Sequence, residues 1–192
     1  MCKLSQINTY YRKHSFGRIL QGDILRDVKF NYAVQEDSEI VEYYFPYIIV
    51  LSQDCDLQQD FNNRNDESSD KNHDKYIQSI LVCSAYLSDD LKKGEHLKRL
   101  DLTMERKNSK QFSTITTNQN ARYHYLEHNH EYQVPHLVLD FKHYYTLPLE
   151  YLYSIYEKHY IASLNELFRE ALSQRFSFYL SRIGLPEIPP KT

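Results

Sequence analysis

YIIVLSQDCDL, residues 47–57, passes within a few positions from an unbroken apolar run into hydroxyl, amide, carboxylate and thiol side chains. The apolar run Tyr47–Leu51 predicts a strand that is buried inside a sheet. The preceding Pro46 cannot donate a ladder hydrogen bond, so it predicts an edge, a bulge or a break between two short strands. The polar residues that follow are therefore expected at the rim of the core.

Further segments with strand character surround this one. Residues 22–34 carry apolar side chains at mostly even spacing, and residues 40–51 and 76–86 are rich in apolar and β-prone residues. Three shorter segments, 112–117, 121–126 and 137–141, follow with polar turns between them. Short strands at regular spacing are typical of an antiparallel barrel or sandwich. We expect a single domain over residues 1–192, mainly β with some α, with a small antiparallel barrel at residues 17–150.

The remaining segments are predicted to be helical or irregular. Residues 161–184 have apolar side chains at helical spacing, and Ser163 and Glu166 have the spacing of an N-terminal capping box. We expect this helix to cover the barrel, or alternatively to dock on a partner. Residues 88–100 predict a short polar helix with Leu91 and Leu97 buried. Residues 54–74 contain few large apolar side chains, which predicts a mobile loop.

Composition limits the class of protein. The chain of 192 residues contains 18 Tyr and no Trp, and its formal net charge is −3, which disfavours capture of nucleic acid by bulk charge alone. Three cysteines without paired spacing predict a reducing compartment. The sequence has no signal-like N-terminus and no apolar run of about 18 residues. These features predict a cytoplasmic protein.

The Asp54-Cys55-Asp56 segment has three interpretations. In the first, it is a strand end, where an aspartate caps backbone N–H groups and Cys55 packs as a small apolar residue. In the second, the three side chains contact a ligand. In the third, Cys55 is a nucleophile, although two flanking carboxylates would oppose formation of its thiolate.

Several side chains with sulfur or imidazole nitrogen are candidate metal ligands. Zinc prefers four N or S ligands at short paired spacings, and no C-x2-C pair is present here. The HYLEHNH run, residues 124–130, is expected to hold exposed histidines in a polar region rather than metal ligands. We therefore predict neither a metal nor another cofactor. The candidate ligands are Cys55, Cys83, His124, His128, His130 and His136.

Cations interleaved with tyrosines suit single-stranded RNA, since bases stack on aromatic rings while cations contact phosphates. A solvated surface is the alternative interpretation, because acidic residues such as Asp89, Asp90 and Glu95 dilute the positive charge. No Gly-rich phosphate loop and no G-x-S-x-G turn is present, which disfavours nucleotide hydrolysis and serine hydrolase chemistry. The cations in question are Arg12, Lys13, Arg18, Arg106, Lys107, Lys110 and Arg122.

The segments QGDIL, FPYIIVLSQDCD, SILVCSAYL and LVLDFKHYYTLP, in this order, resemble the PemK/MazF toxin family over about residues 20–150. The resemblance implies an SH3-like barrel that acts as a dimer, cleaves single-stranded RNA without metal and is neutralised by an antitoxin. Phe45 stands where the family usually has arginine before the strand-two proline, and Ser84 or Ser88 stands near the family's threonine. SQDCDL and the closing SQRFSFYLSRIGLP also resemble a group of bacterial proteins that combine both segments with such a barrel.

The leading hypothesis is therefore an RNA-acting protein of a bacterial toxin or defence system, with cleavage by 2′-hydroxyl attack. Asp54, Asp56 and His143 are the expected acid/base residues, Cys55 lies beside them, and Arg122 is the expected phosphate stabiliser. The alternative, from another class, is a non-catalytic adaptor or accessory subunit that binds a partner protein through the barrel face and the 88–100 helix.

Overall fold

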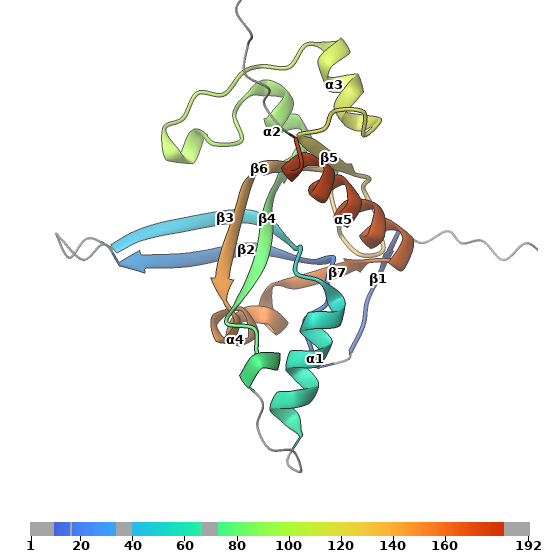
Figure 1. Cartoon of the computed structure of the whole chain (residues 1–192). Coiled ribbons are helices and arrows are strands. Elements are labelled where there is room, and N and C mark those ends of the chain that lie inside the picture. The colour runs from blue at the N-terminus through green and yellow to red at the C-terminus, as the bar shows by residue number, and fades with distance from the viewer. Residues whose placement is uncertain (1–9, 16, 34–39, 67–72, 183–192) are drawn as a thin grey trace, which may run out of the picture.

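The computed structural model describes residues 10–15, 17–33, 40–66 and 73–182. Within these residues, seven strands form one antiparallel sheet in the order β1-β7-β2-β3-β4-β6-β5 (Figure 1). The strands are β1 (Tyr11–Arg12), β2 (Asp23–Ala33), β3 (Ile40–Val50), β4 (Ser79–Leu87), β5 (Tyr123–Leu126), β6 (Leu137–Pro148) and β7 (Tyr160–Leu164).

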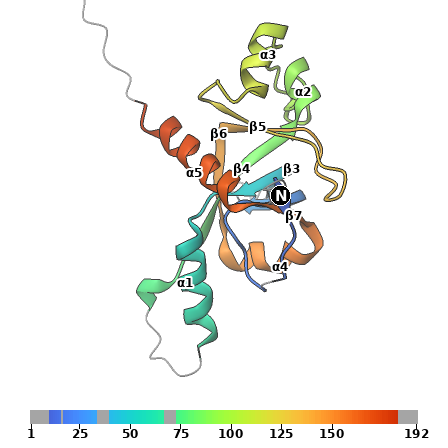
Figure 2. The same cartoon turned by 90° about the vertical axis from the view of Figure 1, so that its right-hand side faces the viewer.

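Helices lie at both ends and on one side of the sheet. Both views place α2 and α3 at the opposite end of the molecule from α1 and α4, with α5 beside the sheet (Figure 1, Figure 2). None of the described helices is both long and apolar enough to cross a membrane. The helices are α1 (Asp54–Asn65), α2 (Ser88–Lys93), α3 (Ser109–Thr116), α4 (Leu149–His159) and α5 (Glu166–Leu180), with 3-10 turns at His73–Lys75 and Lys98–Leu100.

The fold is mixed α/β with an open sheet, so the prediction of a closed barrel is wrong for the part of the chain described. The edge strands β1 and β5 lie at opposite ends of the strand order and do not pair with each other. Closure would need a hydrogen-bonded ladder between them. The strands predicted at residues 22–34, 40–51 and 76–86 are confirmed as β2, β3 and β4, and those at 121–126 and 137–141 correspond to β5 and the first part of β6.

Three apolar clusters hold the helices to the sheet. Leu172 and Phe176 of α5 pack on one face, and Leu149 and Leu152 of α4 pack in a second cluster with residues of β2, β3 and β4. The third cluster joins Leu91, Leu97 and Ile115 to β4, β5 and β6, which confirms that Leu91 and Leu97 are buried. The burial pattern of β4 fits its position inside the sheet, between β3 and β6, because its side chains are buried on both faces.

Pro46 lies where the ladder between β2 and β3 is interrupted. Val28 pairs with Phe45 and Arg26 with Tyr47, whereas Asp27 is not paired and has a positive φ of 54°. The β3–β4 ladder begins only at Tyr47, so Pro46 removes no hydrogen bond from that side. Of the three alternatives predicted for Pro46, the structure shows an edge: β3 runs on as one strand, the β2–β3 register is the same on both sides of Pro46, and only β2 pairs with β3 before Tyr47.

The loop predicted at residues 54–74 is wrong over its first half, which forms α1. The side of α1 that faces the protein is largely polar, and for that reason apolar spacing did not reveal it. Leu57 is buried, and buried Asp60 accepts hydrogen bonds from Arg64 Nε at 2.9 Å and from the Ile77 backbone N–H at 2.7 Å. Asp54 and Asp56 lie in the first turn, where negative charge is favourable.

The strand predicted at residues 112–117 is also wrong, because this segment belongs to helix α3. Asn108 Oδ1 accepts a hydrogen bond from the Gln111 N–H at 2.9 Å, and Gln111 Oε1 accepts one from the Asn108 N–H at 2.9 Å. This reciprocal capping box begins a helix despite the β-branched residues Thr114, Ile115 and Thr116.

The predicted helix at residues 161–184 begins later, because Ser163 belongs to β7 and Asn165 precedes α5. The Ser163 hydroxyl does not cap the helix; it donates to Asp23 Oδ1 at 2.5 Å. Asp23, which is fully buried, also accepts from the Leu20 N–H at 2.7 Å and the Tyr156 hydroxyl at 2.6 Å. Asp23, at the start of β2, therefore connects β2 to the neighbouring strand β7 and holds α4 against the sheet. Gly184 and Pro186, predicted to end the helix, lie outside the described residues.

Candidate functional site

The centre of the candidate site is a bulge in β6. Cys83 of β4 pairs with Tyr144 of β6, and Ala85 pairs with Leu139, so the single residue Ser84 lies opposite the four residues 140–143. The additional residues change which side chains point to each face of the sheet. Bulges of this kind re-aim side chains and are common beside active sites.

Asp140, in this bulge, is a fully buried carboxylate with a bidentate partner. Arg122 Nε donates to Oδ1 at 2.7 Å, Arg122 Nη2 donates to Oδ2 at 2.5 Å, and the Lys142 N–H donates to Oδ1 at 3.0 Å. The hydrogen bonds to Asp140 raise the pKa of Arg122. Paired oxygens of this kind offset the desolvation of a buried carboxylate.

His143 is held against the same carboxylate. Its Nδ1 lies 3.6 Å from Asp140 Oδ2 and 2.9 Å from the Tyr86 hydroxyl. Burial lowers the pKa of His143 and raises that of Tyr86, so both side chains are neutral near pH 7. Because Nδ1 is engaged within the protein and His143 lines a cleft, Nε2 is the atom that a ligand in the cleft would meet.

A second imidazole, His96, stands beside Tyr86, with ring centroids 4.8 Å apart. Both of its ring nitrogens are shielded from solvent and have no hydrogen-bond partner among the described residues. Burial lowers the pKa of His96 to about 4. Polar atoms buried without a partner are rare in proteins, which makes His96 a candidate for ligand binding.

These side chains line one cleft of about 600 Å³, a volume in the range of small-ligand sites. The polar residues within it are Ser84, Tyr86, His96 and His143. Aromatic rings contribute much of the remaining wall, and the Arg99 guanidinium lies 4.3 Å from the centre of the Tyr44 ring. The rim combines both signs of charge. The other aromatic residues are Tyr43, Phe45 and Tyr145, and the rim charges are Glu42, Asp90, Glu95, Lys98 and Arg99.

One glycine fixes the segment that carries His96. Gly94 ends α2 with φ of 77°, and a Cβ at this position would lie 2.3 Å from the Met104 carbonyl oxygen. Only glycine combines that conformation with so close an approach. The chain can therefore turn directly from α2 into the His96 segment.

The predicted site residues fall into two separate groups. Arg122 and His143 both contact Asp140, as described above. Asp54, Cys55 and Asp56 instead open α1, where Cys55 and Asp56 are exposed.

Asp54 is engaged with two arginines. Arg18 Nη1 and Nη2 donate to its two oxygens at 3.1 and 3.2 Å, and Arg169 Nη1 lies 3.4 Å away. Burial raises the pKa of Asp54, but the hydrogen bonds and charges of Arg18 and Arg169 lower it by more, so the net pKa is below its usual value. Asp54 therefore joins the segment before β2 to α5.

Sequence reasoning missed Asp140, Tyr86 and His96 as site residues. One signal was present, because Asp140 is a charged residue within the apolar segment LVLDF. The other two are separated from Asp140 by more than forty positions in the sequence, and only the fold brings Tyr86 and His96 together beside the β6 bulge.

The four histidines proposed as candidate metal ligands lie in different surroundings. His124 is buried, with neither ring nitrogen hydrogen-bonded, and burial lowers its pKa to about 3. The ring centroid of His128 lies 4.2 Å from that of His130 and 5.4 Å from that of His136, near the turn between β5 and β6. Across the described residues, no group of three or more His, Cys, Asp or Glu side chains is arranged to hold a metal ion.

Comparison with known proteins finds no matching family model, no similar curated protein and no similar solved structure.

Proposed function

We propose that this protein acts on single-stranded RNA and cleaves it, without a metal ion, in the cleft that contains His96 and His143. The observation that carries the proposal is the meeting of two neutral imidazoles in one aromatic-walled cleft, one of them held by the buried Asp140–Arg122 pair. Unpaired bases stack on aromatic rings, so the four aromatic side chains of the wall favour a single strand over a duplex.

The reaction is attack of a 2′-hydroxyl on the adjacent phosphorus. His143 Nε2 takes the proton of the 2′-hydroxyl, the new bond from O2′ to phosphorus forms, and the bond to the 5′-oxygen breaks. His96 gives a proton to the leaving 5′-oxygen, which yields a 2′,3′-cyclic phosphate and a 5′-hydroxyl. A bound phosphodiester raises the pKa of both imidazoles by its negative charge. Burial lowers the pKa of His96 to about 4, so this role as acid requires the substrate charge to raise that pKa.

Asp140 and Arg122 are positioning residues in this scheme. Arg122 uses Nε and Nη2 for Asp140 and does not line the cleft. Lys98 and Arg99 do line it, and we assign stabilisation of the phosphate charge to them instead. The biological setting we propose is that of the resemblance noted above, a bacterial toxin or defence system with an antitoxin or other partner protein.

The test is cleavage of a labelled single-stranded RNA in the presence of EDTA. We expect the wild type to cleave and His143→Ala to lose about 100-fold or more of the rate, the usual contribution of a general base. His130→Ala, an exposed histidine on the β5–β6 turn, is the matched control and should retain activity. Absence of cleavage by the wild type would overturn the proposal. Loss in Asp56→Ala with full activity in His143→Ala would move the site to α1.

A non-catalytic adaptor is the second candidate, and the outer surface of α5 favours it. Leu167, Phe178 and Leu180 are 60%, 63% and 52% exposed. Single exposed apolar side chains are common, but three large ones on one helix are side chains that an adaptor could use to contact a partner. Co-purification with the product of the neighbouring gene tests this function: Leu167→Glu/Phe178→Glu should abolish the complex and leave RNA cleavage unchanged. Complex formation that is insensitive to this change would exclude the α5 surface.

A further inference from the structure

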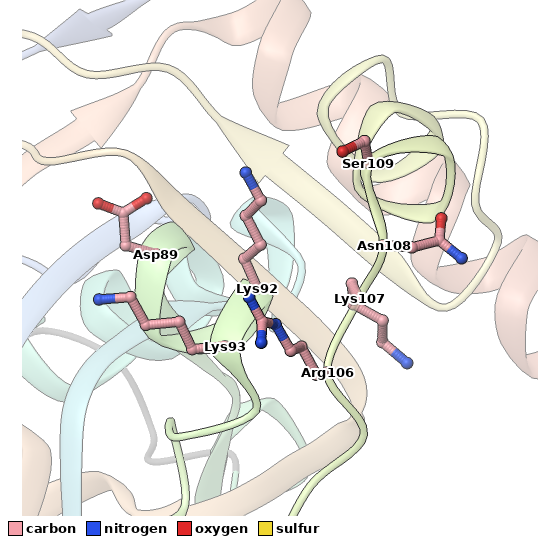
Figure 3. A pocket seen from close by; sticks show the side chains of 7 residues that line it. All are labelled: Asp89, Lys92, Lys93, Arg106, Lys107, Asn108 and Ser109. Carbon is pink, nitrogen blue, oxygen red and sulfur yellow. The ribbon is translucent and has the colours of Figure 1, made fainter.

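A second cleft, of about 680 Å³, contains a concentration of positive charge that is unusual for an acidic chain. Figure 3 shows its lining side chains, which come from α2 and from the segment that leads into α3. Four of these side chains are cationic and one is a carboxylate, Asp89. The cations are Lys92, Lys93, Arg106 and Lys107.

Three of the four cations are not neutralised within the protein. Lys107 Nζ donates to Glu105 at 2.6 Å, whereas Lys92, Lys93 and Arg106 make no ion pair with the described residues. All three are exposed, so the charge is available to an anion in solution. Lys92 Nζ also lies 5.0 Å from the centre of the Phe112 ring, which places an aromatic surface beside the cations.

The cleft also offers neutral polar groups. Asn108 and Ser109, at the start of α3, line the same space as the cations. The N-terminus of a helix carries partial positive charge and so adds to the field of the lysines. Cations combined with amide and hydroxyl groups form the usual set of contacts to nucleic-acid phosphates.

Helix α2 connects this cleft to the candidate active site. Asp90 of α2 lines the imidazole cleft, while Asp89, Lys92 and Lys93 of the same helix line the basic cleft. A helix with its side chains is about 10–12 Å across. A single strand that passes over α2 can therefore contact both clefts within a few nucleotides.

We propose that the basic cleft binds backbone phosphates of the RNA strand whose scissile bond lies in the imidazole cleft. This inference rests on the proposed function, and it adds a binding site outside the region of acid/base chemistry. RNA is favoured over an acidic protein segment because the cleft continues, across one helix, the aromatic and imidazole surface to which bases and phosphates are suited.

The test measures RNA binding separately from cleavage. In a His143→Ala background, which leaves the RNA intact, anisotropy of a labelled single strand of about 12 nucleotides gives the affinity between about 50 and 200 mM salt. The test variant is Lys92→Gln/Lys93→Gln/Arg106→Gln. The matched control removes three exposed cations elsewhere: Lys13 next to β1, Arg26 on β2 and Lys158 on α4. It is written Lys13→Gln/Arg26→Gln/Lys158→Gln.

Each phosphate contact contributes about −0.7 to the salt slope of single-strand binding, so three contacts contribute about −2. The test variant should therefore bind about 100-fold more weakly at about 0.1 M salt, with a slope shallower by about 2, while the control changes little. Equal affinity and slope in the two triple variants would overturn the proposal and make an acidic protein segment the better occupant. Cleft-dependent binding without cleavage by the wild type would refute the nuclease alone, and cleavage with charge-independent binding would refute this proposal alone.

Discussion

Replacing Asp140 with asparagine tests whether the buried ion pair holds the candidate site together. The change preserves the shape of the side chain but removes the charge that faces Arg122 and His143. The Asp140 side chain is fully buried and that of Arg122 is 25% exposed. Removing one partner of a buried pair costs about 3–5 kcal/mol, and the partial exposure of Arg122 favours the lower limit.

We therefore expect Asp140→Asn to lower the free energy of unfolding by about 3 kcal/mol. For a chain of this size that loss corresponds to a decrease of roughly 6–12 °C in Tm. Arg122→Gln should cost more, about 4 kcal/mol, because it leaves a fully buried carboxylate without its cation. The double variant should cost less than the sum, by about 2 kcal/mol.

Urea denaturation of the wild type, both single variants and the double variant measures this coupling as a double-mutant cycle. Exposed Lys158→Gln is the control for a simple change of charge. A loss below about 1 kcal/mol in Asp140→Asn, or additive effects of the two changes, would refute the reasoning that this pair organises the site.

Three other regions give independent predictions. Gly94→Ala should destabilise the fold by at least about 1–2 kcal/mol, since it combines an unfavourable φ with a clash at Met104 O; thermal unfolding measures this loss, and an unchanged Tm would contradict it. Arg175→Met should loosen α5 and cost about 3 kcal/mol, because Arg175 donates to the carbonyls of Asn118, Asn120 and Tyr123; hydrogen exchange that remains slow in α5 would contradict this. The pKa of His124 is about 3 in the folded protein and about 6.5 in the unfolded chain, so only the unfolded chain binds the proton between those values, and stability falls as pH decreases. His124→Leu should remove up to about 1.4 kcal/mol per pH unit of this dependence in denaturation curves between about pH 6 and 4, and an unchanged slope would contradict it.

Strands were predictable where burial follows the apolar pattern. β2, β3 and β4 carry apolar side chains on faces that are buried, so spacing alone located them. α1 was missed because Asp60 and Asn63 occupy buried positions that pattern analysis assigns to apolar residues. α3 was mistaken for a strand because Thr114–Thr116 have β propensity, whereas the deciding signal was the Asn108–Gln111 capping box.

The candidate site was predictable only in part. Arg122 and His143 were identified as single residues, but the element that unites them is Asp140. Its position depends on the register of β6 against β4, which a single sequence does not determine. Ser163 illustrates the same limit, since its spacing fits a capping box while its hydroxyl binds Asp23 across the sheet.

The short edge strands affect how two copies of this protein can associate. In the described residues, β1 has two residues and β5 has four. An exposed strand edge can recruit a strand from another molecule, but edges this short offer few backbone groups for pairing. Longer unpaired edges lie on the β2–β3 hairpin, because β2 pairs with β7 only at Asp23–Leu25 and β3 pairs with β4 only from Tyr47. Within the described residues, a strand from a second copy would therefore find more backbone groups on this hairpin than on β1 or β5.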